Sequence, residues 1–188
     1  MSREAIVLTG MQNEEEVSGF CCQEGPGAQD LEDFLKHDAL QYEGDHLGRT
    51  YLGWSDEQLV GYLTLSAGSV RFHAEGEKAQ TEAGLDHIRF AMPGVLLGRL
   101  AVDDRYRSHG FGRDLFQWAL GLARDHTAPF VGCRWLFIDA YACRRDWYEV
   151  QGCKIAGKAP VGVSGSDTIK MCFDLFPPEQ LNLEFADE

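Results

Sequence analysis

The residues with the clearest chemical pattern form a short turn between an apolar strand and an amphipathic helix. The turn spans Arg107 to Gly112 and ends where the helix is expected to begin. Backbone N–H groups at a helix start have no intrahelical acceptor and lie at the positive end of the helix dipole, which favours phosphate binding. Glycine at positions 110 and 112 removes the Cβ atoms that would hold a diphosphate away from the backbone. We therefore predict a diphosphate site on the backbone of this turn.

The surroundings of the turn narrow the class of cofactor. A dinucleotide-binding fold requires a further glycine before this pair and an acidic residue about 20 residues later. A Walker motif requires Gly-Lys followed by Ser or Thr. Neither pattern is present here. Arginines at positions 99, 105, 107 and 113 add positive charge around the turn, opposed by Asp103 and Asp104.

Apolar periodicity indicates the elements that must position this turn. Strands are expected over 5–9, 50–54, 59–65, 95–102, 135–138, 154–156 and 168–175. Helices are expected over 28–42, 111–122 and 144–150, the last ending at Gly152. Residues 55–58 are predicted to connect a hairpin, and the polar stretch 73–86 to form an exposed loop. The chain shows no repeat and no interdomain linker, so this order of elements predicts one α/β domain over residues 1–188.

The strand–turn–helix pattern resembles a known family. Arg107, Gly110 and Gly112, after Leu100-Ala101-Val102, are similar to the Arg/Gln-x-x-Gly-x-Gly/Ala acetyl-CoA motif of the GNAT superfamily of N-acetyltransferases. The resemblance implies a GNAT-like domain with a mixed, mostly antiparallel sheet, flanked by helices and splayed at the acetyl-CoA site. It implies acetyl-CoA as co-substrate, with its pantetheine arm along the backbone of Ala101 and Val102. The implied pyrophosphate contacts are Arg107, Ser108, His109, Gly110, Phe111, Gly112 and Arg113.

A second segment supports the resemblance. Residues 147–153 are similar to the family's Phe-Tyr-x-x-x-Gly-Phe segment, whose tyrosine protonates the departing coenzyme A thiolate in many members. The resemblance therefore makes Tyr148 the candidate general acid. Tyr141 and Arg144 depart from the family's usual Asn and Ala, and Cys153 replaces an aromatic residue. Asp139, at the expected end of a strand, is a candidate base or a cap of the following turn, and we interpret His109 as a cofactor neighbour.

The acceptor amine is predicted from charge. The formal net charge is −13 at pH 7, whereas nucleic-acid binders normally carry a basic surface that contacts phosphates. An acidic surface attracts a cationic acceptor. The sequence therefore favours acetyl transfer to the primary amine of a small cationic molecule or peptide.

Two alternatives stay open. Residues 30–35, 61–66, 92–93 and 97–102 resemble the tRNA-acetylating toxins of bacterial toxin–antitoxin modules, which would make charged tRNA and an antitoxin the partners. Against this, the net charge predicts no measurable acetylation of charged tRNA at physiological salt. The other alternative is a non-catalytic acetyl-CoA-binding sensor or interaction module, which would keep the glycines of the turn without needing an acid. A homodimer is compatible with each interpretation.

Compartment and metals are predicted from what the sequence lacks. No apolar run reaches the roughly 20 residues that span a bilayer, and the N-terminus lacks the features of a secretory signal. We therefore expect a cytoplasmic protein with no membrane partner. The six cysteines show no zinc-ligand spacing, so we expect no metal and free thiols, Cys21 and Cys22 included.

Overall fold

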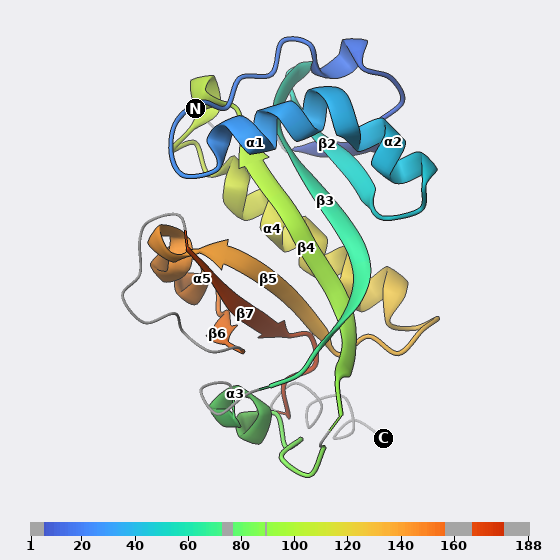
Figure 1. Ribbon diagram of the computed structural model, residues 1–188, viewed down its shortest axis with the longest axis vertical. Coiled ribbons are helices and arrows are strands. Elements are labelled where there is room, and N and C mark those ends of the chain that lie inside the picture. Colours follow the sequence, from blue (N-terminus) through green and yellow to red (C-terminus); the bar gives the residue numbers. More distant parts are fainter. Residues whose placement is uncertain (1–5, 73–76, 89, 157–166, 179–188) are drawn as a thin grey trace. The chain divides into compact units, whose positions relative to one another are not determined.

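The chain folds around an open seven-stranded sheet with helices beside it (Figure 1). A computed structural model describes residues 6–72, 77–88, 90–156 and 167–178. The strand order is β1-β2-β3-β4-β5-β7-β6, which leaves β1 and β6 at the edges. The pairs β1–β2, β2–β3, β5–β7 and β6–β7 are antiparallel, and β4–β5 is parallel. The predicted α/β fold with a mixed, mostly antiparallel sheet is confirmed.

Most elements fall on or beside the segments that periodicity predicts. The strands are β1 Val7–Gly10, β2 Arg49–Ser55, β3 Gln58–Val70, β4 Met92–Val102, β5 Trp135–Tyr141, β6 Lys154–Ile155 and β7 Thr168–Asp174. The α-helices are α1 Ala28–Asp33, α2 Ala39–Gly44, α3 Glu77–Glu82, α4 Phe111–Gly121 and α5 Arg145–Val150. Two π-helical segments, Phe34–Asp38 and Leu122–Thr127, follow α1 and α4, and 3-10 turns occupy Glu15–Val17, Asp104–Tyr106 and Ala142–Arg144. Ala5, the expected start of the first strand, lies outside the described residues.

The prediction of an exposed loop over 73–86 is wrong for residues 77–86, which the structure describes. Residues Glu77–Glu82 form α3, and Ala79, Gln80 and Ala83 are buried. The Gln80 side-chain amide donates hydrogen bonds to the carbonyls of Leu85 (2.7 Å) and Ile88 (2.6 Å), which fixes the segment after the helix. A helix this short and polar has weak apolar periodicity, because buried glutamine and alanine replace the large side chains that would reveal it.

The described chain forms two compact units. The first comprises Met1–Ser66 and Leu97–Ala119, and the second comprises Ala67–Leu96 and Leu120–Glu188. Strands β3 and β4 and helix α4 contribute residues to both units, so neither unit is a separate stretch of sequence. The single domain over 1–188 stays a prediction.

The core of the first unit packs α1, α2 and their π-helical link against β2 and β3. Phe34, Leu35 and Ala39 recur at helical spacing within the helix predicted over 28–42, and all three are buried there. Gly61 on β3 allows the closest approach of backbone in this core. A Cβ at Gly61 would lie 2.6 Å from the Ala101 carbonyl oxygen and 2.8 Å from the Leu115 side chain. This glycine therefore permits the end of β4 and the start of α4 to pack tightly on β3.

The core of the second unit surrounds Trp135 and Phe137 on β5. Its buried members also include Val70, Ala79, Ala83, Met92, Ala156 and Cys172. The parallel ladder between β4 and β5 joins Gly94, Val95 and Leu96 to Trp135, Leu136 and Phe137. This ladder covers only three residue pairs, consistent with the splayed sheet that the family resemblance implied.

The cysteines are free thiols, as predicted. All six are unpaired, and four of them are buried. Burial raises the pKa of the Cys22, Cys133 and Cys153 thiols, so these groups stay protonated and unreactive at neutral pH. Separately, none of the helices that the structure describes is long and apolar enough to cross a membrane.

Candidate active site

The predicted diphosphate turn has the backbone geometry that anion binding needs. Ser108 and Gly110 both have positive φ angles, of 64° and 87°. The Gly110 carbonyl accepts hydrogen bonds from Arg113 N (3.0 Å) and Asp114 N (3.3 Å), so Gly110 is the residue that opens α4. Left-handed residues just before a helix turn successive N–H groups toward one concavity. The N–H groups of the first helical turn then face the same site with the positive end of the helix dipole.

Aromatic contacts hold this turn in place. The Phe111 side chain is buried, and its ring meets Tyr106 edge-on at a centroid distance of 6.3 Å. The His109 ring stacks with Phe111, also at a centroid distance of 6.3 Å, and its Nδ1 lies 2.7 Å from the Arg107 carbonyl oxygen. The His109 ring is therefore part of the structure of the turn, and its interpretation as a neighbour of the cofactor stays a prediction.

Asp103 is a fully buried carboxylate at the base of the turn. It accepts hydrogen bonds from the backbone N–H of Cys21 (2.9 Å) and Arg105 (3.0 Å) and from Arg105 Nε and Nη2 (both 2.8 Å). Burial alone would raise its pKa, but the hydrogen bonds from Arg105 and Cys21 outweigh burial, so the pKa of Asp103 lies below its ordinary value. Asp103 thus remains ionised and joins an N-terminal arm to the turn.

This N-terminal arm, Gly19–Glu24, is also tied to Asp104 and Arg107. Asp104 Oδ2 accepts from Gln23 N at 2.7 Å, and its Oδ1 lies 2.6 Å from Arg107 Nε. Arg107 Nη2 donates to the Glu24 carbonyl (2.5 Å), and Arg107 Nη1 lies 3.4 Å from the Glu24 carboxylate. The guanidinium of Arg107 is therefore engaged within the protein, and the predicted contact of Arg107 with a diphosphate depends on its backbone.

The arginines expected to surround the turn with charge therefore have other roles. Arg105 and Arg107 bind carboxylates, as described. Arg99 Cζ lies 3.4 Å from the ring centroid of Phe34 and 5.6 Å from that of Tyr42, a cation–π contact. Arg113, by contrast, is exposed in the first turn of α4, where its positive charge is accessible to an anion.

The candidate pantetheine contacts lie at the end of β4. Ala101 is buried and Val102 is half-buried. The next residue, Asp103, donates its backbone N–H to the Val60 carbonyl at 3.0 Å, which anchors the end of β4 on β3. The first unit therefore brings Ala101, Val102 and the turn Arg107–Arg113 together as one strand–turn–helix.

Tyr148, the candidate acid, lies on α5 in the second unit. Its side chain is 8% exposed, and its ring meets Trp147 edge-on at 4.8 Å. Burial raises the pKa of the Tyr148 phenol above its ordinary value of 10. The hydroxyl therefore keeps its proton throughout the neutral range, as a proton donor must. Gly152, at φ 95°, ends this helical region, where Cys153 N donates to the Tyr148 carbonyl at 3.0 Å.

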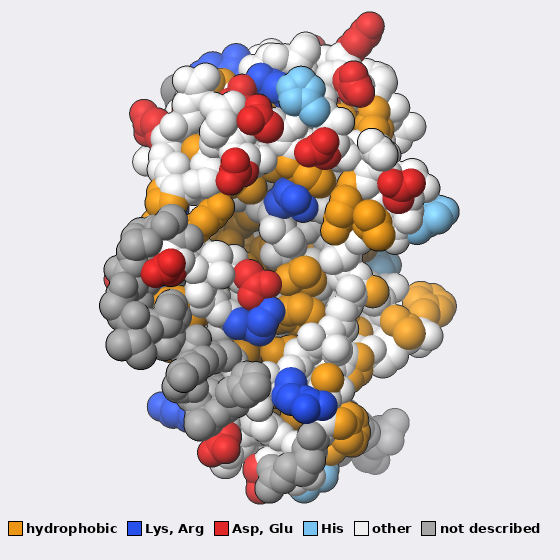
Figure 2. Space-filling model, in the orientation of Figure 1, with side chains coloured by type: hydrophobic (Ala, Val, Ile, Leu, Met, Phe, Trp, Pro, Cys, Tyr) orange, Lys and Arg blue, Asp and Glu red, His pale blue; other side chains and the backbone are white. Residues whose placement is uncertain are grey.

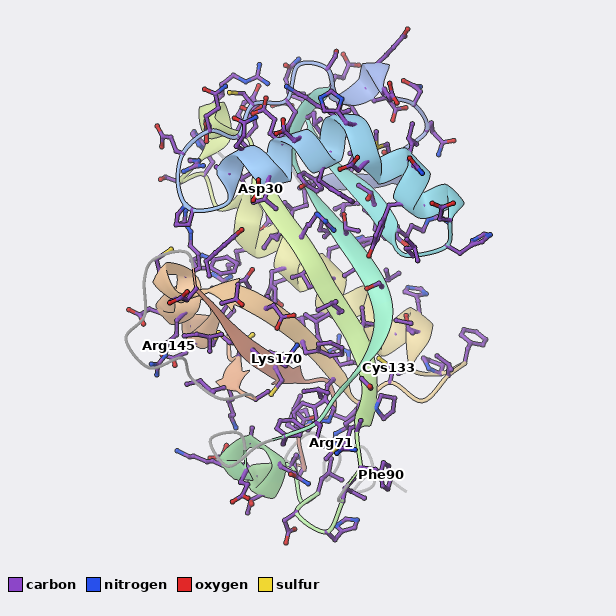
Figure 3. The ribbon with its side chains drawn as sticks, in the orientation of Figure 1. Asp30, Arg71, Phe90, Cys133, Arg145 and Lys170 are labelled. Atoms are coloured by element: carbon purple, nitrogen blue, oxygen red, sulfur yellow. The ribbon has the colours of Figure 1, made fainter. Side chains whose placement is uncertain are left out.

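Asp139 does not cap the turn after β5. It lies within the strand, directly opposite Lys170 of β7, and its carboxylate is 2.7 Å from Lys170 Nζ. Lys170 is labelled in Figure 3 on β7, with Arg145 on α5. The expected strand stopped at Ile138, whereas β5 continues to Tyr141, which explains the error.

The comparisons with known proteins decide the family. Residues 12–146 match the model of the acetyltransferase (GNAT) family, which is more than half of the chain. The chain belongs to the GNAT family of acetyltransferases. It is therefore an acyltransferase, and the predicted class of enzyme is confirmed.

Individual relatives agree with this family. The chain is 30% identical over 114 residues to a tRNA-acetylating toxin of Mycobacterium tuberculosis, covering 61% of this chain and 65% of that relative. Its fold matches AtaT complexed with acetyl-methionyl-tRNAfMet, with a TM-score of 0.69, 20% identity, and coverage of 96% and 99% of the two chains. The fold also matches a tyrosine-to-phenylalanine mutant of the toxin AtaT, bound to acetyl-CoA and the C-terminus of the antitoxin AtaR. The TM-score is 0.64 and the identity 19%, and the match covers 97% of this chain and 99% of that one.

The residues of this GNAT protein suit a bound diphosphate. A left-handed Gly110, a helix start directly after it and an exposed Arg113 provide backbone donors and one cation.

The structure also bears on a possible metal site. Within the described residues, no group of three or more His, Cys, Asp or Glu side chains could hold a metal ion.

Sequence reasoning missed Gly61 and Asp103 as positioning residues. The Asp103-x-Arg105 spacing signals a side chain that caps its own turn, and this signal was available. No local pattern could have paired Asp103 with Cys21, because 82 residues separate them.

Proposed function

We propose that this GNAT enzyme transfers the acetyl group of acetyl-CoA to the α-amine of aminoacyl-tRNA. The observation that carries the proposal is the similarity to a tRNA-acetylating toxin, 30% identical over 114 residues. The match of its fold to AtaT, a protein known in complex with acetyl-methionyl-tRNAfMet, points the same way. This proposal replaces the small cationic or peptide amine that net charge favoured.

The charge that favoured a small amine is concentrated at the ends of the sequence. Residues 1–45 contain eleven carboxylates and two basic residues, and residues 179–188 contain four carboxylates and no basic residue. Residues 46–178, which include the turn and Tyr148, contain 15 carboxylates and 15 basic residues. Carboxylate side chains gather over α1 and α2 on the face drawn in Figure 2. A net charge of −13 therefore does not describe the part of the chain that carries the chemistry.

In the proposed reaction the turn binds and Tyr148 moves a proton. Acetyl-CoA, when bound, supplies the activated acetyl thioester. Backbone N–H groups from Arg107 to Gly112 and the Arg113 side chain hold its pyrophosphate. The backbone of Ala101 and Val102 positions the pantetheine arm. The Tyr148 hydroxyl, protonated at neutral pH, donates its proton to the leaving thiolate.

An α-amine acceptor needs only a weak base to lose its proton. An α-amino group has a pKa of about 7.7–8.0, whereas a lysine-like amine has one of about 10.4. At pH 7.5 roughly a third of α-amines are neutral, against about 0.1% of lysine-like amines. The proposed acceptor can thus lose its proton to water, without a carboxylate dedicated to that role.

The experiment compares acceptors directly. Purified enzyme is incubated with acetyl-labelled acetyl-CoA and, separately, with total aminoacylated tRNA, uncharged tRNA, spermidine or a lysine-containing peptide. We expect label only in aminoacylated tRNA, released by mild base as N-acetyl amino acid. Label in spermidine or the peptide, and none in charged tRNA, would return the acceptor to a small or peptide amine. Tyr148→Phe enzyme is the matched control for enzyme-dependent transfer.

The proposal also gives the protein a partner class. By analogy with AtaT, whose complex with the antitoxin AtaR is known, we propose an antitoxin as the physiological partner. Expression of the wild-type chain alone should arrest bacterial growth, and expression of Tyr148→Phe should not. Arrest by both would attribute toxicity to something other than acetyl transfer.

A further inference from the structure

The edge strand β1 borders a hollow that belongs to the first unit and lies outside the diphosphate turn. The hollow has a volume of about 800 Å³. Its walls include Val7 and Thr9 of β1, Trp54 of β2, and the carboxylates of Glu16, Asp56 and Glu57. The proposed acetyl transfer assigns no role to these residues.

The outer side of β1 offers backbone groups for pairing. Among the strands that the structure describes, β1 pairs with β2 alone, and Met11 N donates to the Thr50 carbonyl at 3.3 Å. In an antiparallel ladder, alternate residues direct their N–H and C=O groups to the same side. Because the Met11 N–H faces β2, the N–H and C=O groups of Leu8 and Gly10 face away from it. The Gly10 carbonyl already accepts a hydrogen bond from Gln12 Nε2 at 3.2 Å. This edge is therefore a template for another extended segment.

The hollow beside this edge is acidic. Its three carboxylates come from two places in the chain, Glu16 and the hairpin turn Asp56–Glu57. Among the residues that the structure describes, none that lines the hollow is basic. Asp56 and Glu57 both have positive φ angles, 50° and 61°, where glycine or asparagine would be less strained. The guanidinium of Arg49 lies beside Gly10, with Nη2 3.3 Å from the position of a Cβ at Gly10, and its Nε is 3.7 Å from the Glu43 carboxylate.

Apolar surface lies next to these charges. Val7 is 62% exposed on β1. The half-buried Trp54 has its indole N–H bonded to Thr9 Oγ1 at 3.0 Å, so its ring presents an apolar wall. A strand that pairs with β1 would place every second side chain over the hollow, beside both this wall and the carboxylates, and the others on the opposite face of the sheet.

We propose that β1 and its acidic hollow bind an extended segment of a partner protein that carries Lys or Arg side chains between apolar ones. The segment adds a strand at the β1 edge, and its cations face Glu16, Asp56 and Glu57. A second copy of this chain fits poorly, because pairing β1 with β1 would bring two acidic hollows together. The proposal does not depend on the identity of the acceptor amine.

Two fluorescein-labelled octapeptides of alternating residues, Lys–Val and Glu–Val, test the proposal by fluorescence anisotropy. Gly10→Pro removes the outward N–H of β1 without breaking a bond to β2, and Gly10→Ala is its matched control. Asp56→Asn/Glu57→Gln removes the charge and keeps the size of both side chains. We expect the wild type to bind only the Lys–Val peptide. Its Kd should rise at least tenfold in Gly10→Pro, at least fivefold in the double variant, and less than twofold in Gly10→Ala.

Three results would overturn the proposal. The first is no binding of the Lys–Val peptide at millimolar concentration, and the second is equal binding of both peptides. The third is a homodimer in solution that Gly10→Pro dissociates, which would assign the edge to a second copy. Acetyl-CoA-dependent thermal stabilisation, measured on every variant, confirms that each is folded and separates this test from that of the proposed function.

Discussion

Two strand-to-helix connections of this protein follow neighbouring parallel strands and yet differ in kind. The connection from β4 to α4 passes through two left-handed residues, Ser108 and Gly110, before an eleven-residue helix. The connection from β5 to α5 is the 3-10 turn Ala142–Arg144, without a positive φ angle, before a six-residue helix. A helix start becomes a diphosphate site when the turn before it directs several N–H groups inward. The second connection instead fixes the buried position of Tyr148.

The charged side chains around the two connections differ in the same way. Arg105 and Arg107 reach back to the arm Gly19–Glu24 and to Asp103 and Asp104. Arg145 pairs within its own helix, with Glu149 at 2.7 Å. The first turn is thus held by an arm distant in sequence together with Asp103 and Asp104. The second is held by the Arg145–Glu149 pair and by a hydrogen bond from Ala142 N to the Asp167 carbonyl at 2.8 Å. A preorganised anion site requires a rigid turn, and the contacts of the turn between β4 and α4 provide that rigidity.

The largest expected effect lies at the second connection. Tyr148→Phe keeps the ring and its contact with Trp147 but removes the proton donor. We expect kcat to fall about 10²- to 10⁴-fold with little change in the Kd of acetyl-CoA, because a positioned acid acts on the chemical step. Single-turnover acetyl transfer and calorimetric binding measure the two quantities.

Tyr62→Phe is the matched control for loss of a buried tyrosine hydroxyl. Tyr62 is fully buried and donates to the Leu31 carbonyl at 2.7 Å. Removal of the Tyr62 hydroxyl should lower the free energy of unfolding by about 1 kcal/mol and leave kcat near the wild-type value. Equal kcat in wild type and Tyr148→Phe would assign Tyr148 to the core.

The next effect concerns Asp103, which holds the connection from β4 to α4. Asp103→Asn leaves buried N–H groups of Cys21 and Arg105 without a charged acceptor, so we expect a loss of about 2 kcal/mol in the free energy of unfolding. The arm Gly19–Glu24 should loosen, and acetyl-CoA should bind more weakly. Urea denaturation measures the stability. Asp125→Asn, which removes an exposed carboxylate next to Arg124, should be close to neutral.

The pH dependence of this effect has a definite sign. The pKa of Asp103 is lowered in the folded protein, so its contribution is present above the unfolded value of about 4 and is lost as the pH falls through the folded pKa. The stability difference between wild type and Asp103→Asn should therefore narrow below pH 4. A difference that stays constant down to pH 3 would mean that the charge of Asp103 is not what stabilises the turn.

The remaining prediction tests the diphosphate site itself. Ligand at a hundredfold its Kd stabilises a protein by about 2.7 kcal/mol, measurable as a rise in Tm. Gly112→Val places a branched side chain in the first turn of α4, and this rise should disappear. Gly121→Val makes the same change at the other end of the same helix, where the nearest atom to a new Cβ is 3.9 Å away. An unchanged rise in Gly112→Val would remove the diphosphate from this turn.

The accuracy of the sequence predictions followed the range of the interactions involved. Glycines at 110 and 112, the periodicity of Phe34, Leu35 and Ala39, and the hairpin at 55–58 act over a few residues, and the structure has the elements they predicted. Helix α3 was missed because its position depends on burial of Ala79 and Gln80, which no local pattern marks. The π-helical segments Phe34–Asp38 and Leu122–Thr127 were likewise invisible to a 3.6-residue period.

The sequence by itself determined the strand–turn–helix, the left-handed glycine within it and the balance of charge along the chain, because these depend on residue type and near neighbours. Only the tertiary structure decided what the arginines do. Arg105 precedes the predicted diphosphate turn and Arg107 begins it, but Asp103, Asp104 and the arm more than 80 residues away hold their guanidinium groups. A charge has no local geometry that selects its partner, so its role is fixed only when the chain brings the opposite charge within reach.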